Sequence, residues 1–262
     1  MARIIRTAFC YKSRHTLINM NLNNYKLTII VPVFNEAENL ENLQKTFNEY
    51  FSKSSIKSKV LFVDDGSTDE SFDKIKAICH VNSNFEYIKF DKNYGLSSAI
   101  KAGIDNIDTE LTGYIDADLQ TSPHDFDILL RYISDYNVVI GYRGNRKDKL
   151  TKRIQSKIAN TIRRFLINDG IIDTGCPLKI LKTDIAKKIP FFEGMHRFIP
   201  ALVQLQGVKV KQVNVGHFER LHGKSKFNIF NRSIKPLQDV FAYRWMKSRF
   251  INYQIESKNF KR

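Results

Sequence analysis

Between residues 25 and 144, short runs of β-branched and aromatic residues alternate with segments of helical spacing, and this alternation limits the possible folds most. The first run, "KLTIIVPVF", contains a proline, and the segment after it places Leu40, Leu43 and Phe47 on one helical face. Four further runs follow: "KVLFVDD", "FEYIKF", "LTGYIDADLQ" and "NVVIGYRG". Buried runs that alternate with helices are typical of βαβ units. The sequence therefore predicts an α/β fold, with a mostly parallel sheet and helices on both faces.

Two further patterns place helices and strands outside this alternation. The segment "SPHDFDILLRYIS" carries Ser122 and then Pro123, a pattern typical of a helix start. Beyond residue 144 we expect a basic helix over "KRIQSKIANTIRRFL", strands over "GCPLKIL" and "VKVKQVNVGHF", and a helix over "HRFIPALVQLQG" that Gly207 ends. No linker separates a second globular domain.

The charge of the chain is unevenly distributed. The sequence has 42 lysines and arginines against 27 acids, a net charge of +15. The bases gather in residues 141–164 and 220–262, whereas the acids gather between Glu36 and Asp127. A basic balance of this size indicates an anionic partner, such as a phosphorylated substrate, a membrane surface or a nucleic acid. We expect no nucleic acid, because the acids line the predicted ligand edge and no known binding motif is present.

The chain carries few signals for export or membrane insertion. No apolar stretch reaches the roughly 18 residues that span a bilayer. Residues 1–24 are basic, and we expect them to form a disordered tail. Cys10, Cys79 and Cys176 show no paired spacing, which favours reduced thiols in a cytoplasmic protein.

Polar residues follow four of the predicted strands, at the ends where open α/β sheets bind ligands. These strand ends carry Pro32, Phe34 and Glu36; Asp64 and Asp65; Asp116, Asp118 and Gln120; and Arg143. Asp116 and Asp118 would repel one another unless a counter-ion separates them. Carboxylates suit Mg²⁺ or Mn²⁺. Each motif alone could be an Asp-rich turn, but together they predict one shared site.

The motifs "VPVFNEAENL", "VDDGSTDES", "NYGLSSAIKAG" and "DADLQTSP" resemble those of inverting family-2 glycosyltransferases with the GT-A (nucleotide-diphospho-sugar transferase) fold. The most similar branch contains dolichyl-phosphate mannose synthases and bacterial polyprenyl-phosphate sugar transferases. The resemblance runs from about residue 27 to residue 226, and more weakly to residue 249. It implies a GT-A domain over 25–228, followed by a basic amphipathic helix and tail over 229–262.

The resemblance also implies roles for individual residues. It places the donor nucleotide against Pro32, Phe34, Glu36, Val63, Asp65, Asp116, Ala117, Asp118, Arg220 and Lys226. Phe34 stands where that branch often has tyrosine, so one hydroxyl contact is lost. The metal ligands implied are Asp116, Asp118 and Gln120, and the acceptor-phosphate contacts are Arg143, Arg153 and Lys157. The catalytic residues implied are Asp118, Arg143, Arg220 and Lys226.

The activity implied is metal-dependent transfer of a hexose from GDP-mannose or a UDP-sugar to a polyprenyl or dolichyl phosphate, with inversion. The alternative is a family-2 enzyme that glycosylates a glycan hydroxyl. That reaction needs a carboxylate base, which relatives often carry as a late "ED" pair. The corresponding segment here reads "GMHRFIPAL" and offers His196 beside Arg197, so the sequence favours the phosphate acceptor.

The segment "SIKPLQDVFAYRWMKSRF" places Leu237, Phe241 and Trp245 on one helical face, with Ile234 one turn earlier. Such a helix either lies on an anionic bilayer or packs against its own domain. We expect peripheral association with the cytoplasmic face of a membrane, directly or through an anchoring partner protein.

Overall fold

The computed structural model describes residues 25–144, 161, 166–219, 229–251, 253, 256–257 and 259, without the side chains of 229–237. Within these residues, seven strands form one sheet in the order β3-β2-β1-β4-β6-β5-β7. The strands are β1 (Leu27–Val33), β2 (Ser58–Asp64), β3 (Phe85–Lys89), β4 (Leu111–Tyr114), β5 (Val138–Tyr142), β6 (Lys179–Lys182) and β7 (Val210–Asn214). All neighbouring pairs are parallel except those of β6, which runs antiparallel to β4 and β5.

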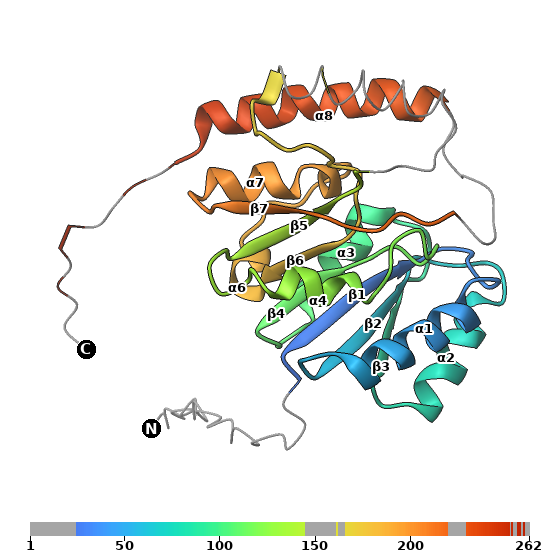
Figure 1. Ribbon diagram of the computed structural model, residues 1–262. Helices are drawn as coiled ribbons and strands as arrows, with labels where there is room; N and C mark the ends of the chain where they lie inside the picture. Colours follow the sequence, from blue (N-terminus) through green and yellow to red (C-terminus); the bar gives the residue numbers. More distant parts are fainter. Residues whose placement is uncertain are drawn as a thin grey trace, which may run out of the picture.

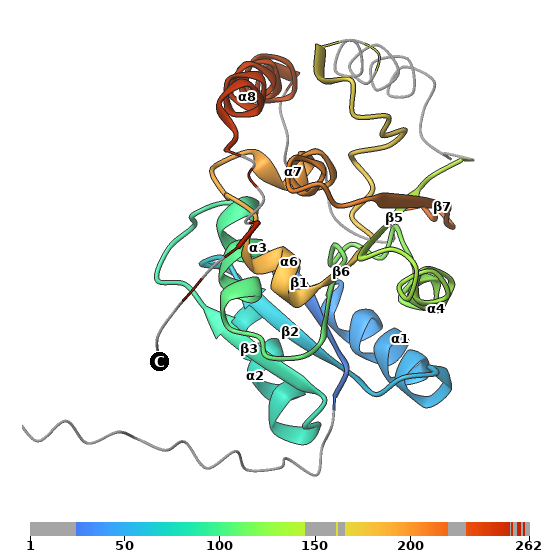
Figure 2. The same ribbon diagram turned by 90° about the vertical axis from the view of Figure 1, so that its left-hand side faces the viewer.

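Helices cover both faces of this sheet (Figures 1 and 2). They are α1 (Leu40–Lys53), α2 (Ser71–Val81), α3 (Leu96–Asp105), α4 (Asp125–Leu130), α6 (Thr183–Lys187), the 3₁₀ turn η1 (Met195–Arg197), α7 (Ile199–Leu205) and α8 (Ile229–Arg249). The mostly parallel α/β fold is therefore confirmed.

The alternation of side chains along β1 explains the two layers. Ile29 and Val31 belong to a buried cluster with residues of α1, α2 and α4, whereas Ile30 belongs to a second cluster, on the other face, with residues of α3, α6, α7 and α8. Helix α3 approaches the sheet closely at Gly103, where an added Cβ would lie 2.7 Å from a methyl group of Ile30. The sheet is buried on both sides, so the edge where the strands end is the candidate surface for ligand binding.

Two element boundaries differ from the sequence prediction. Helix α4 begins at Asp125 and not at Ser122, because the Ser122 hydroxyl accepts a 3.2 Å hydrogen bond from the backbone N–H of His124 and closes a turn before the helix. Strand β4 ends at Tyr114, so the two aspartates after it lie in a loop. Most of the expected basic helix over 152–166 falls outside the described residues.

Helix α8 packs against α7 with the face opposite to the predicted stripe. Val240 and Tyr243 are buried in the core, and the Tyr243 hydroxyl donates a 3.2 Å hydrogen bond to the carbonyl oxygen of Ala201. Phe241 and Trp245 of the stripe point outward and are 59% and 67% exposed. The side chains of Ile234 and Leu237 lie outside the described part of the chain.

Two basic residues of α8, both exposed, also contact residues 166 and 167. Arg244 and Lys247 donate hydrogen bonds of 3.2 Å to the carbonyl oxygens of Leu166 and Ile167. Helical conformation ends there, since Asn168 takes a left-handed φ of 53°. Cations at such a helix end are favourable. Over the described residues, no helix combines the length and the apolar character that crossing a bilayer requires.

Candidate functional site at the carboxyl edge of the sheet

Tyr114 and Gln120 hold the two aspartates that follow β4. The Tyr114 hydroxyl donates a 2.6 Å hydrogen bond to Oδ1 of Asp116. Oδ1 of Asp118 accepts a 3.1 Å hydrogen bond from the backbone N–H of Gln120, and the intervening Leu119 takes a left-handed φ of 55°. Asp118 is 7% exposed. The loop is therefore a fixed turn that presents two carboxylates at the sheet edge.

The electrostatics of this turn favour a bound cation. Burial, followed by the charge of Asp118, raises the pKa of Asp116 to about 6. The hydrogen bond from Tyr114 and the cations Lys179 and Arg143 offset this effect in part. A carboxylate pair this costly to ionise is stabilised by a divalent ion.

The donor set fits a magnesium or manganese ion that keeps other ligands. Among the described residues, no three histidine, cysteine or acidic side chains gather closely enough to hold a metal by themselves. Asp116 and Asp118 supply two carboxylates, and the Gln120 amide is adjacent. Mg²⁺ in phosphate-transfer sites takes one or two carboxylates and fills its other positions with water and substrate phosphates.

Asp65, predicted to contact the donor nucleotide, holds the loop before α3. Its carboxylate accepts hydrogen bonds from the backbone N–H groups of Tyr94 (2.7 Å) and Gly95 (2.9 Å) and from the side chain of Asn93 (3.0 Å). An added Cβ at Gly66 would lie 2.3 Å from the backbone carbon of Lys92, so the two loops touch. Asp65 thus joins the loop after β2 to the loop before α3 and would form one wall of the candidate site.

The other residues predicted to contact the donor differ in how deeply their side chains are buried. Val63 is fully buried in the core, and Ala117 is 3% exposed, so neither side chain offers an open surface. Pro32, Phe34 and Glu36 are partly buried at the end of β1. The Glu36 carboxylate accepts a 2.6 Å hydrogen bond from the Asn39 side chain.

Arg143, at the end of β5, forms a buried ion pair with Asp173, a residue that sequence reasoning missed. Nε and Nη2 of Arg143 lie 2.7 Å and 3.0 Å from the two carboxylate oxygens, and the side chains are 9% and 8% exposed. Asp173 also accepts a 3.1 Å hydrogen bond from the Gly175 N–H, the turn geometry that "DTG" favours. A bidentate pair fixes the plane of the guanidinium group.

Lys179 is a second residue that the sequence did not point to. It lies opposite Tyr114 in the β4–β6 pairing, and it is 2% exposed. Its ammonium group donates to the carbonyl oxygen of Cys176 and lies 5.1 Å from the centre of the Tyr114 ring. Burial lowers the pKa of Lys179. Lys179 therefore places a positive charge on the sheet side of the turn that holds Asp116 and Asp118, which we call the acidic turn.

His196 is unsuited to act as a strong base. Its Nδ1 lies 2.8 Å from the Ser97 hydroxyl, within reach of a hydrogen bond. Burial, together with the charges of Arg197 and Lys179, lowers the pKa of His196 to about 3. The imidazole is therefore neutral at physiological pH and a weak proton acceptor.

Four predicted site residues, Arg153, Lys157, Arg220 and Lys226, lie outside the described residues. The chain leading to Arg220 does run beside the acidic turn, since the backbone N–H of Phe218 donates a 2.9 Å hydrogen bond to the carbonyl oxygen of Gln120.

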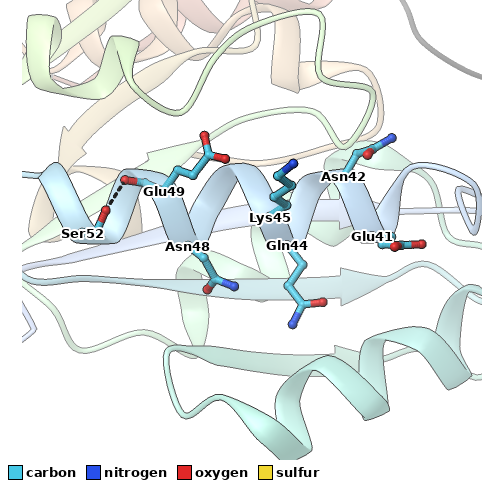
Figure 3. A pocket seen from close by; sticks show the side chains of 7 residues that line it. All are labelled: Glu41, Asn42, Gln44, Lys45, Asn48, Glu49 and Ser52. Carbon is cyan, nitrogen blue, oxygen red and sulfur yellow. Dashed lines mark hydrogen bonds between the residues drawn. The ribbon is translucent and has the colours of Figure 1, made fainter.

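A surface hollow elsewhere on the molecule is unrelated to these residues (Figure 3). It lies on the solvent side of α1 and is lined by Glu41, Asn42, Gln44, Lys45, Asn48, Glu49 and Ser52. Its lining side chains all belong to α1, and none of them is a residue of the site described above.

The fold is shared with solved glycosyltransferases. Glucosyl-3-phosphoglycerate synthase from Mycobacterium tuberculosis, solved with Mn²⁺ and UDP, superposes with a TM-score of 0.64 at 12% identity, covering 87% of this chain and 81% of that one. A mannosyltransferase from Pyrobaculum calidifontis, solved with GDP-mannose and Mn²⁺, gives 0.59 at 15% identity, covering 85% and 69%. The architecture is thus that of GT-A glycosyltransferases.

The sequence comparisons place the chain more narrowly. Residues 28–190 match the family model "Glycosyl transferase family 2", and the chain belongs to that family. It is 28% identical to dodecaprenyl-phosphate galacturonate synthase of Rhizobium johnstonii, over 92% of this chain and 72% of that protein. It is 30% identical to undecaprenyl-phosphate 4-deoxy-4-formamido-L-arabinose transferase of Salmonella choleraesuis, over 82% and 66%. The chain thus spans about two thirds to three quarters of these relatives' length.

Proposed function

We propose that this glycosyltransferase moves a hexose from a nucleotide-diphosphate sugar to a polyprenyl phosphate at a membrane surface. The observation that carries the proposal is the acidic turn at Asp116 and Asp118, set beside the Arg143 guanidinium group at the same sheet edge. The names of the relatives, which are polyprenyl-phosphate sugar transferases, support the acceptor class.

On the donor side, Asp116 and Asp118 would hold a Mg²⁺ or Mn²⁺ ion, with Gln120 as a further ligand. Such an ion would supply positive charge opposite the departing diphosphate. Tyr114 and Lys179 keep the acidic turn in place from behind. Phe34, Glu36 and the wall built by Asp65 surround the nucleotide. Arg220 and Lys226 complete the cationic surroundings of the leaving group, which is the electrostatic stabilisation that such a reaction needs.

On the acceptor side, a phosphate monoester needs no general base. Its second pKa of about 6 leaves it largely dianionic at neutral pH. One phosphate oxygen attacks the anomeric carbon, the bond from that carbon to the diphosphate oxygen breaks, and its electron pair leaves with the nucleoside diphosphate. Attack from the opposite side inverts the carbon. Arg143, Arg153 and Lys157 orient the acceptor, and the weak basicity of His196 agrees with a reaction that takes no proton from a hydroxyl.

The outward face of α8 suits contact with a bilayer. Phe241 and Trp245 stand exposed one helical turn apart, and Phe250, Ile251 and Tyr253, after the end of the helix, are exposed as well. Aromatic side chains on a basic helix favour the lipid interface, and the positive charge of the chain favours anionic lipid. This contact places the site near a lipid-linked acceptor.

A transfer assay with separate donors and acceptors tests the proposal. The purified protein is incubated with Mn²⁺, radiolabelled GDP- or UDP-sugars, and either undecaprenyl phosphate or an oligosaccharide. We expect label in a product that extracts into organic solvent and is released by mild acid. Label transferred to the oligosaccharide alone would instead assign a glycan hydroxyl as acceptor. Salt-sensitive DNA binding without sugar turnover would overturn the enzyme assignment.

A further inference from the structure

We infer that Asn35 is a positioning residue that clamps the two loops of the donor site together. This inference rests on the proposed function, because it concerns how the nucleotide-binding loops keep their shape. The loops are residues 34–39, after β1, and residues 65–70, after β2. They leave neighbouring parallel strands, in which Val33 is paired with Asp64.

Asn35 has an unusual backbone for a residue with a side chain. Its φ is 51°, in the left-handed region, which costs free energy for most residues and which asparagine tolerates better than others. A residue held there requires compensating interactions from its surroundings. Phe34 and Glu36, the two donor contacts predicted in this loop, lie on either side of it.

The compensation comes from the neighbouring loop, through reciprocal hydrogen bonds. The backbone N–H of Asn35 donates to the Ser67 hydroxyl at 3.0 Å. In return, Oδ1 of Asn35 accepts a 2.8 Å hydrogen bond from the backbone N–H of Thr68. The Ser67 N–H donates to Oδ1 of the buried Asp64 at 3.1 Å, which anchors this pairing to the end of β2.

Two further contacts extend the clamp along the first loop. The backbone N–H of Glu36 donates to the Ser71 hydroxyl at 2.8 Å, and that of Ala37 donates to the Asp69 carboxylate at 3.3 Å. Each residue of the donor loop from 35 to 37 is thus tied by its main chain to the second loop or to Ser71 at the start of α2. The pairing with Thr68 is solvent-exposed, so its loss leaves the core intact.

The clamp assigns a structural role to the segment "GSTDES", whose sequence alone indicates only a turn. Ser67, Asp69 and Ser71 use their side chains to hold the first loop. A donor loop held before binding loses less conformational freedom when the nucleotide arrives, which favours affinity. The clamp therefore acts on donor binding and leaves acceptor binding unchanged.

Asn35→Gly separates the hydrogen bond from the backbone geometry, because glycine adopts a φ of 51° without cost. We expect calorimetric titration with Mn²⁺–GDP and Mn²⁺–UDP to give a Kd about fivefold above that of the wild type for whichever nucleotide binds. Asn35→Ala adds backbone strain and should weaken binding at least as much. In transfer assays the donor KM rises in the same proportion, whereas the acceptor KM stays unchanged.

Ser67→Ala and Asn48→Ala complete the design. Ser67→Ala removes the hydroxyl that accepts the hydrogen bond from the Asn35 N–H. The double variant Asn35→Gly/Ser67→Ala should have a nucleotide Kd no higher than that of the single variant with the higher Kd, because both changes open the same clamp. Asn48→Ala removes an exposed 3.0 Å hydrogen bond to Asn82 on the outer helices and should leave Kd unchanged. An unaltered Kd in folded Asn35→Gly, or equal rises in both KM values, overturns the inference. A wild type that binds neither nucleotide overturns the proposed function instead.

Discussion

The Tyr114 hydroxyl and the Asp116 carboxylate, two residues apart, are joined by a 2.6 Å hydrogen bond at the end of β4. This bond engages one carboxylate oxygen and fixes the orientation of the group. Lys179 lies 5.1 Å from the centre of the same tyrosine ring, so a buried cation, a phenol and a carboxylate follow one another toward the sheet edge. The fixed conformation of the turn at Asp116 and Asp118 thus depends on Tyr114, a residue of the sheet.

Tyr114→Phe should lower kcat/KM about tenfold, because Asp116 loses its partner and the acidic turn loses its fixed orientation. The free energy of unfolding should fall by only about 1 kcal/mol. Steady-state kinetics and urea unfolding measure the two effects. Tyr243→Phe is the matched control, since it removes another buried tyrosine hydrogen bond far from the acidic turn. Equal activity losses in both variants would show that the effect is general destabilisation.

Asp118→Asn should reduce sugar transfer by about 10²-fold or more while the protein stays folded, because the amide cannot supply the charge that balances a divalent ion. The measurement is turnover at saturating Mn²⁺, with circular dichroism to check the fold. Asp105→Asn, at an exposed position of α3, serves as control. Near-normal turnover of Asp118→Asn would refute the metal-site assignment.

Asp173→Ala should destabilise the protein by about 3 kcal/mol, because it leaves the Arg143 guanidinium group buried without its counter-ion. Arg143→Met combined with Asp173→Leu should cost less than Asp173→Ala alone, since no uncompensated charge remains. Denaturant titrations of the variants measure these differences. If Asp173→Ala lowers the free energy of unfolding by less than about 0.5 kcal/mol, roughly the contribution of an exposed ion pair, solvent reaches the Arg143–Asp173 pair.

His196 should contribute a loss of stability as the pH drops below about 6.5. The unfolded chain protonates His196 near its ordinary pKa, whereas the folded protein does so only near 3. Between these values the unfolded state binds more protons, so folding is weakened on acidification. His196→Asn keeps a side-chain oxygen near the Ser97 hydroxyl and should flatten the profile by at most about 1.4 kcal/mol per pH unit. Identical profiles for variant and wild type would contradict the low pKa.

Phe241→Ser combined with Trp245→Ser should weaken binding to vesicles that contain phosphatidylglycerol by about tenfold, because the apolar contribution to interfacial binding is lost. The thermal unfolding temperature should change little, since both side chains point outward. Co-sedimentation with the vesicles provides the measurement. Val81→Ser, at a 74% exposed apolar position on α2, is the control. If the control loses as much binding as the α8 variant, α8 is not the contact surface.

The sequence by itself determined the α/β fold and the edge of the sheet at which the candidate site lies. Runs of β-branched residues and helical spacing are local properties, and the polar residues after β1, β2, β4 and β5 must gather once those strands run parallel. The sequence did not determine where each element begins: Ser122 initiates a turn, and α4 begins three residues later. The roles assigned to Arg220 and Lys226 stay predictions.

Only the tertiary structure decided which partners hold the site. Asp173 reaches Arg143 because the chain returns beside β5, and Lys179 backs Tyr114 because β6 inserts antiparallel between β4 and β5. Strand order and cross-strand register are non-local, so residue spacing does not encode them. The same reason explains why Arg244 of α8 donates to the carbonyl oxygen of Leu166, 78 residues earlier in the chain.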